Sequence, residues 1–204
     1  MRFNSCSSNV FPPSPLPDEV VEADERYQNA GEKGRTHTDP DDPPRRRAND
    51  VKGHGTWDND RPPIAGVIGR ASGQVRLSVC QQSDRKTLGP FVVTHTQPPC
   101  TVNTDEWQAY NTLSDTGRTH VQVCHSFGLG EWARDDDGDG IREVHTNSIE
   151  GFWTGLRNFL RPFRGVNKKH LSHYVAVHEW ASNVKQVTDD FLRAMMWCFT
   201  SKPT

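Results

Sequence analysis

The sequence has no long apolar run, no paired cysteine motif and no recognisable secretory signal. Its apolar stretches are far shorter than the roughly 18 residues that a membrane-spanning helix needs, so no membrane partner is expected. The first 17 residues carry one basic residue and no apolar core, which argues against a signal peptide. The five cysteines form no CxxC pair, and their odd number argues against a disulfide framework. We therefore expect a cytoplasmic, nucleoid-associated protein.

The sequence also has no large excess of positive or of negative side chains. The chain has 24 Lys and Arg residues against 26 Asp and Glu residues, which gives a net charge of −2. Such a balance provides no general attraction to nucleic acid, so a role of that kind must depend on local patches. The sequence contains neither a glycine-rich phosphate loop nor a GxSxG motif. Any chemistry therefore has to come from other side chains.

The apolar residues that are present are unevenly distributed. Residues 1–63 contain nine of the 14 prolines and only 14 apolar residues, so the core must come mainly from residue 64 onward. Residues 1–17 are expected to be a disordered leader. Residues 28–63, rich in charge, Gly and Pro, form a polar insertion of a length that is uncommon inside compact domains. Between these segments, Val20–Ala23 is a short strand candidate.

Strand patterns precede helix patterns along the rest of the chain. Residues 64–70 and 74–82 are typical of two strands joined by a hairpin. Further strands are predicted at 100–107 and 120–127. Because strands that come first and helices that come later are typical of sheets packed on helices, this order indicates an α+β or a mixed α/β domain.

Helical spacing begins at Ile149, after which apolar residues recur every three or four positions as far as Leu160. Thr146 or Asn147 is the expected N-cap of this helix. Two more helices are predicted around residues 171–178 and 187–195, and the second of these belongs to a C-terminal helix and tail over 186–204.

Two aspartates stand where predicted strands meet polar residues, and a glutamate lies in the first turn of the predicted helix. Taken singly, Asp24 and Asp105 are best interpreted as solvated strand ends, and Glu150 as an acid favoured by the helix dipole. Taken together, carboxylates from two strands and a helix can hold two divalent cations about 3.5–4 Å apart, as in phosphodiester displacement. Hard cations such as Mg²⁺ prefer these oxygen ligands. Because the chain has 26 acidic residues, many such triples exist and spacing alone is not proof.

A resemblance to a known family adds weight to this interpretation. The segments VEADERY (21–27), NTDEWQAY (103–110) and HTNSIEGFWTGLR (145–157) resemble the signature blocks of DDE-type insertion-sequence transposases. More narrowly, they are similar to the ISXO-type group, related to the Merlin elements, whose pattern runs roughly VEVDE-x-Y, TDGW-x-AY and HTN-x-IEG-x-W-x-x-x-K. The resemblance spans about residues 18–185, and its third block is the most specific. It implies an RNase H-like fold, in which helices flank a central mixed sheet.

The resemblance also implies a role for each matching residue. Asp24 and Asp105 would be the first two metal ligands and Glu150 the third, together holding two Mg²⁺ or Mn²⁺ ions. Some members of the broader group have Asn as the third catalytic residue, which makes Asn147 a rival or companion to Glu150. Arg157 stands where the family usually has Lys; it still offers a cation to a phosphate, although the two residues are not interchangeable.

The sequence departs from the family pattern at several positions. Ala23 replaces a Val, Arg26 replaces a frequent Thr, and Glu106 replaces the Gly that follows the second Asp. Relatives usually carry a DNA-recognition region ahead of the first Asp, whereas only 23 residues precede Asp24 here. A truncated or remnant copy is therefore one interpretation of this chain.

A basic stretch follows the predicted catalytic helix. Residues 157–170 contain five basic residues and no acid. Such a run is usually a solvated face, but its position after Glu150 suits contact with a phosphate backbone. The expected DNA-binding residues are Arg157, Arg161, Arg164, Lys168 and Lys169, with Trp107 as a residue able to stack on a frayed base. Trp153 is expected to pack in the core.

The acidic run at residues 135–140 resembles the start of an EF-hand loop. The remainder of that motif is missing, because Arg142 falls where an apolar residue is expected and Thr146 where the bidentate Glu belongs. The run is therefore interpreted as a polar loop that does not bind Ca²⁺.

The resemblance thus implies a transposase catalytic domain, with metal-dependent hydrolysis at the transposon end followed by transfer of the freed strand into target DNA. Its partners would be the transposon ends, the target DNA and at least a second protomer, because two ends must be joined. Two alternatives stay open. One is an inactive or truncated derivative that only binds DNA or partner subunits, and the other is an RNase H-like nuclease without strand transfer.

Overall fold

The computed structural model describes residues 14–41, 54–124 and 131–184. Most of the predicted leader and the predicted helix around residues 187–195 lie outside these ranges, as does the middle of the polar insertion. No helix within the described ranges is long and apolar enough to cross a bilayer.

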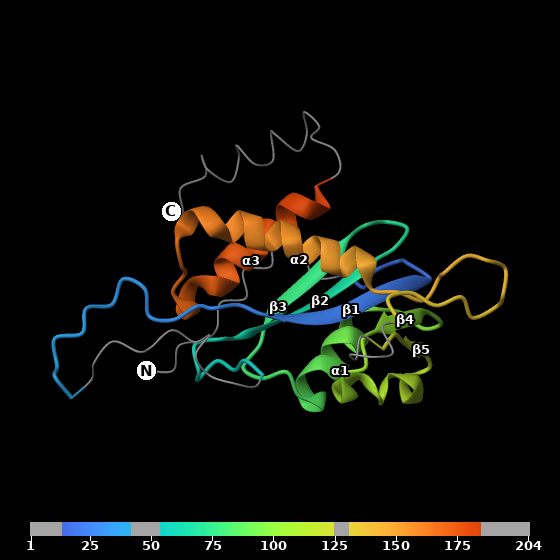
Figure 1. Cartoon of the computed structure of the whole chain (residues 1–204), viewed down its shortest axis with the longest axis horizontal. Coiled ribbons are helices and arrows are strands. Elements are labelled where there is room, and N and C mark those ends of the chain that lie inside the picture. Colours follow the sequence, from blue (N-terminus) through green and yellow to red (C-terminus); the bar gives the residue numbers. More distant parts are fainter. Residues whose placement is uncertain (1–13, 42–53, 125–130, 185–204) are drawn as a thin grey trace, which may run out of the picture.

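A five-stranded mixed sheet forms the centre of the fold (Figure 1). Its order is β3-β2-β1-β4-β5, so the first strand is also the middle one. β1 pairs antiparallel with β2, and β2 with β3, whereas β4 runs parallel to both β1 and β5. The strands are β1 (Val20–Tyr27), β2 (Pro63–Gly69), β3 (Val75–Val79), β4 (Thr101–Thr104) and β5 (Thr119–Gln122).

Helices cover both faces of this sheet. Helix α1 (Arg85–His95) packs on one face, and α2 (Asn147–Leu160) and α3 (Lys168–Asn183) pack on the other (Figure 1). Because neighbours lie above and below it, all seven residues of β2 are buried. The side chains of β1 alternate between the layers: Val21 and Ala23 enter the core shared with α1, so the residues between them face α2.

The predicted mixed α/β class is confirmed, and so are the hairpin, the strand around residue 20 and the helix that begins near residue 147. The apolar stripe of α2 is buried through Ile149, Trp153, Leu156 and Leu160. The strands predicted at 74–82 and 100–107 are shorter than expected, because β3 ends at Val79 and β4 at Thr104.

The sequence did not predict α1. This helix contains Pro90 and buries only Leu88, Gly89 and Val92, so it has little apolar periodicity. Its start is fixed locally, because the Asp84 carboxylate accepts a hydrogen bond from the backbone N–H of Thr87 at 3.0 Å. An Asp followed three residues later by a Thr was therefore the available signal for the N-terminus of α1.

Candidate active site

Asp24 lies on β1, opposite Gly66 of β2, on the strand face that is turned toward α2. The indole Nε1 of Trp153 donates a hydrogen bond to its Oδ2 at 2.7 Å, and the backbone N–H of Glu25 donates to its Oδ1 at 2.8 Å. A Cβ atom at position 66 would stand 2.6 Å from Cη2 of Trp153, so glycine there makes room for the indole. Trp153 is buried as predicted, and it also orients a carboxylate.

Asp105 comes directly after β4, and the parallel pairing of β4 with β1 places it beside the middle of the sheet. Its Oδ1 accepts a hydrogen bond from the backbone N–H of Trp107 at 3.0 Å. Glu150 lies in the first turn of α2, where its exposed carboxylate accepts a hydrogen bond from Thr146 Oγ1 at 3.1 Å.

The three predicted acids affect one another electrostatically. Burial and the negative charges of Asp105 and, more weakly, Glu150 together raise the pKa of Asp24 to about 7, against the hydrogen bonds from Trp153 and the Glu25 backbone. Carboxylates from three separate sequence motifs are therefore close enough to repel one another. A divalent cation relieves such repulsion, and carboxylate oxygens are its preferred ligands. The donor set of this site thus fits a hard divalent cation.

Glu25 adds a fourth carboxylate that the sequence did not point out. It faces the opposite layer, where Tyr110 Oη donates to its Oε2 at 2.8 Å. Burial, together with the charges of Asp24 and Asp105, raises its pKa to about 7, against the hydrogen bonds from Tyr110 and Tyr27. Acidic side chains at this end of β1 therefore lie on both faces of the sheet.

Asn147, the rival of Glu150, is the first residue of α2 and is exposed. Its backbone N–H donates to Nδ1 of His145 at 3.3 Å. Asn147 and Glu150 are three residues apart on one helix and therefore lie near each other on its surface. The arrangement is compatible with either residue beside Asp24, and only Glu150 adds a charge there.

A buried glutamate, Glu22, connects β1 to the start of α2. Its Oε2 accepts hydrogen bonds from the backbone N–H groups of Ser148 and Ile149 at 2.8 and 3.0 Å, and its Oε1 accepts from Nε of Arg70 at 2.8 Å. Thr146 is the N-cap residue of α2, as predicted, but its side chain makes no capping hydrogen bond, and the Glu22 carboxylate accepts from the first-turn N–H groups instead. The available signal was its position two residues before Asp24, which places both on one strand face.

The basic residues divide into an exposed group and one exception. Arg157, Arg161, Arg164 and Lys169 are exposed around the C-terminal end of α2 and the start of α3. Lys168 is buried instead: its Nζ lies 2.9 Å from Oδ1 of Asp60 and donates to the carbonyl oxygen of Trp57 at 2.9 Å. Because the charge of Lys168 is used inside the fold, the predicted contact with DNA would require its ammonium group to leave Asp60 and Trp57.

Trp107 is half-buried against the core that α1 shares with the sheet. Its Nε1 donates to the carbonyl oxygen of Ser83 at 2.9 Å, and its ring lies 4.3 Å from that of His54, measured between centroids. The indole holds the segment after Asp105 against the sheet. A role in stacking on DNA would require at least one of these contacts to be released.

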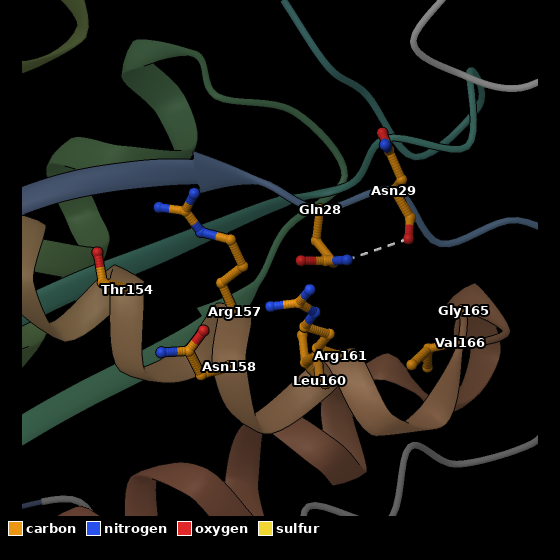
Figure 2. Close-up of a pocket in the computed structure, with 9 residues that line it drawn as sticks. All are labelled: Gln28, Asn29, Thr154, Arg157, Asn158, Leu160, Arg161, Gly165 and Val166. Carbon is orange, nitrogen blue, oxygen red and sulfur yellow. Dashed lines mark hydrogen bonds between the residues drawn. The ribbon is translucent and has the colours of Figure 1, made fainter.

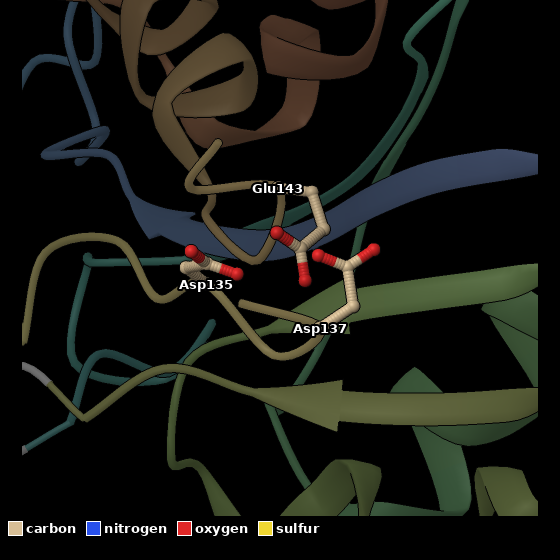
Figure 3. A group of neighbouring side chains, drawn as sticks. All are labelled: Asp135, Asp137 and Glu143. Carbon is tan, nitrogen blue, oxygen red and sulfur yellow. The ribbon is translucent and has the colours of Figure 1, made fainter. Parts of the chain in front are cut away.

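The loop that contains the acidic run at residues 135–140 brings together a separate group of carboxylates, those of Asp135, Asp137 and Glu143 (Figure 3). Within the described residues, this is the group whose oxygens all lie within 4.8 Å of one another, and the triad of Asp24, Asp105 and Glu150 is more widely spaced. Glu143 rather than Thr146 completes the group, which the EF-hand template did not predict. The loop's carboxylates accept hydrogen bonds from its own backbone, including those of Gly138 and Gly140.

Comparison of the sequence with known proteins finds transposase relatives. The model of the ISXO2-like transposase domain matches residues 16–183. A protein of the transposable element ISH50 from Halobacterium salinarum is 32% identical over 164 residues, which cover 80% of this chain and 52% of that protein. A transposase-like protein from Haemophilus influenzae is 26% identical over 101 residues, covering 50% of this chain and 74% of its own length. The chain thus spans about half the length of its Halobacterium relative.

Among solved structures, the catalytic core domain of BIV integrase aligns with 90% of this chain and 99% of its own, with a TM-score of 0.49 and 10% sequence identity. The mixed sheet and its flanking helices are those of the RNase H-like fold that the sequence resemblance implied. Because the family model covers most of the chain and all three acidic motifs, the chain belongs to the family of ISXO2-like transposase domains.

Proposed function

We propose that this chain is a transposase catalytic domain that cleaves DNA at a transposon end and transfers the freed strand into target DNA. One observation carries the proposal. Asp24, Asp105 and Glu150 come from three motifs far apart in the sequence, and the fold gathers their charges beside the middle strand, where they raise the pKa of Asp24. The family membership supports the same reaction class.

Asp24, Asp105 and Glu150 would hold the divalent metal, proposed to be two Mg²⁺ or Mn²⁺ ions. When bound, the ions would lower the pKa of the attacking hydroxyl and neutralise charge that develops on the phosphate. Trp153 contributes by fixing the Asp24 carboxylate through its indole N–H. Glu22 contributes by anchoring the first turn of α2, which carries Glu150.

The chemistry proceeds by direct displacement at phosphorus. In the first step a water oxygen attacks the phosphodiester, the bond to the 3′ oxygen breaks, and that oxygen takes up a proton to give a free 3′-OH. In the second step this 3′-OH attacks a target phosphodiester and displaces its 3′ oxygen. No covalent intermediate with the protein is needed, so positioning and electrostatic stabilisation supply the catalysis.

DNA would approach along the exposed basic group at the C-terminal end of α2. Arg157, Arg161, Arg164 and Lys169 offer cations to the phosphate backbone, and Arg side chains bind phosphate in a bidentate manner. Because two transposon ends are joined in one event, the active form is proposed to be a homodimer or a higher oligomer on DNA.

The proposal is tested by strand cleavage of duplex DNA carrying the ends of the element that encodes this chain. We expect wild-type protein to nick this DNA with Mg²⁺, to leave a 3′-OH and to be inactive with EDTA, and we expect Asp105→Asn to remain at background with either. Asp115→Asn changes an exposed acid outside the three motifs and is the control. Equal cleavage by wild type and Asp105→Asn would overturn the metal-site assignment. DNA binding without any cleavage by wild type would support the inactive derivative instead.

A second comparison separates Glu150 from Asn147. We expect Glu150→Ala to reduce the cleavage rate at least about tenfold more than Asn147→Ala, as is usual when a group that orients or holds a metal is lost. The reason is that Glu150 contributes a negative charge beside Asp24, whereas Asn147 is neutral. Both side chains are exposed, so the two variants should unfold at similar temperatures. A larger loss for Asn147→Ala would transfer the third catalytic position to the amide.

A further inference from the structure

A cavity of about 520 Å³ adjoins the candidate active site, between the end of β1 and helix α2 (Figure 2). Its wall combines amide and guanidinium groups with an apolar surface from Leu160 and Val166. In Figure 2 the side chains of Arg157 and Arg161 extend toward β1 and Gln28. The amide-bearing side chains around the cavity are those of Gln28, Asn29 and Asn158.

Arg26 stands between this cavity and the acidic triad. Side chains two residues apart on a strand share a face, so Asp24, Arg26 and Gln28 follow one another along the face turned toward α2. Asp24 bonds to Trp153 at one end of this row, and Gln28 lines the cavity with Arg157 at the other. Burial and the positive charge of Arg157 lower the pKa of Arg26, and Asp24 opposes them.

The guanidinium groups at this place lack internal partners. Within the described residues, the side chains of Arg26, Arg157 and Arg161 make no hydrogen bond or ion pair, and Nε of Arg26 is buried without an acceptor. Two other arginines of the fold are fully engaged: Arg70 donates to Glu22 and to two backbone carbonyls, and Arg118 donates to Thr96, Thr116 and Val93. The positive charges of Arg26 and Arg157 repel each other, the charge of Asp24 offsets part of that repulsion, and a bound phosphate would offset more of it.

We propose that Arg26 and Arg157 together bind the DNA phosphate next to the scissile one, and that the adjoining cavity receives the unpaired nucleotide attached to it. The inference rests on the proposed function, since the triad defines which phosphate is scissile. One guanidinium group comes from β1 and the other from α2, their charges act on each other, and each can donate two N–H groups to the oxygens of a phosphodiester. A cavity of this volume lies within the range that holds a small ligand, and its amides can pair with a base edge. A duplex cannot supply such a nucleotide unless its end is frayed.

The test measures binding by fluorescence anisotropy with Ca²⁺ or EDTA, in which cleavage does not contribute. The probes are a blunt 30-base-pair duplex and the same duplex with three unpaired nucleotides at one end. We expect wild type to bind the forked probe about tenfold more tightly, which is the effect of one base contact. Arg26→Gln should reduce this preference to near unity and lower the slope of log affinity against log salt by about 0.7–0.9.

Two further variants complete the design. Arg26→Lys keeps the positive charge but loses the planar guanidinium group. It should therefore keep the slope of log affinity against log salt and lose most of the preference for the forked DNA probe. Arg35→Gln alters an exposed arginine that is paired with Glu32 and should match wild type. Equal binding of both probes by wild type, or an unchanged preference in a folded Arg26→Gln protein, would overturn the proposal. Cleavage by wild type is measured separately, so a protein that cleaves without preferring the fork refutes only this inference. A protein that prefers the fork through Arg26 but never cleaves refutes only the proposed reaction.

Discussion

Replacing Asp24 by asparagine is expected to stabilise the fold in the absence of divalent cations and, at the same time, to abolish cleavage. The carboxylate is half-buried beside Asp105 and Glu150, and burial with their charges raises its pKa to about 7. Asparagine keeps an oxygen that can accept the hydrogen bond from Trp153, and it carries no charge. At pH 8 in EDTA the gain should be on the order of 1–2 kcal/mol, because one pKa unit corresponds to about 1.4 kcal/mol and water screens part of the repulsion.

The gain should depend on pH in a definite direction. The pKa of Asp24 is about 7 in the folded protein and 3.8 for the free side chain. Between these values the folded state holds a proton that the unfolded state has released, so wild-type stability falls as the pH rises from about 4 to about 7. The asparagine variant lacks this titration. The difference in unfolding temperature between the two proteins should therefore widen up to about pH 7 and remain constant above it.

Addition of Mg²⁺ or Mn²⁺ should reverse the order of the two proteins. A cation that binds the folded state stabilises wild type by mass action, and the variant has lost a ligand for it. Cleavage by the variant should fall by about a thousandfold or more, since a metal contributes several kcal/mol to the stabilisation of transition-state charge. Asp115→Asn is the matched control. An Asp24→Asn protein with unchanged pH dependence and intact cleavage would remove Asp24 from the site.

Much of the site could be predicted because its chemistry is local in the sequence. Each acid of the triad lies within a short motif whose order along the chain matches the family pattern, and strand or helix periodicity placed each motif on the correct type of element. No motif indicates how close two elements lie in the fold. Asp24 and Asp105 approach each other only because β4 pairs in parallel with β1, after a helix that the sequence pattern did not reveal.

The contacts that the sequence pattern did not reveal have the same origin. Lys168 belongs to a run of five basic residues, and nothing in that run indicates that its ammonium group reaches back to Asp60, more than 100 positions earlier in the chain. Trp107 likewise looks like an isolated exposed aromatic until the fold places Ser83 and His54 against it. Patterns within a segment report which face of an element is apolar. They do not report which long side chain finds a partner across the sheet.

Glu22 shows what such a long-range partner does, and its replacement by alanine should have the largest effect on stability. The side chain is fully buried, and its carboxylate receives hydrogen bonds from Arg70 and from two backbone N–H groups at the start of α2. Removing it leaves the half-buried guanidinium group of Arg70 without its carboxylate partner, next to two N–H donors that have lost their acceptor. The loss of one partner of a buried ion pair typically costs about 3–5 kcal/mol. Urea unfolding monitored by tryptophan fluorescence would measure it, with the exposed Glu19→Ala as control.

The contribution of charge can be separated from that of shape. Glu22→Gln keeps an oxygen that can accept from the N–H groups of Ser148 and Ile149 but removes the charge opposite Arg70, so its loss should be smaller than that of Glu22→Ala. In a double-mutant cycle, Arg70→Met should cost less in the Glu22→Ala background than in wild type, because the two side chains are in contact. Additive losses would mean that the pair contributes nothing beyond its separate packing.

If Glu22 positions the catalytic helix, its effect must extend beyond stability. Glu150 directly follows Ser148 and Ile149, whose N–H groups Glu22 holds, in the same first turn of α2, so a loosened start of α2 should displace a proposed metal ligand while the sheet retains Asp24 and Asp105. At a temperature where Glu22→Gln is fully folded, we expect it to need a higher Mg²⁺ concentration for half-maximal cleavage than wild type. A merely structural role predicts an unchanged requirement for Mg²⁺ once the protein is folded. The same carboxylate would then link the stability of the fold to the geometry of its metal site.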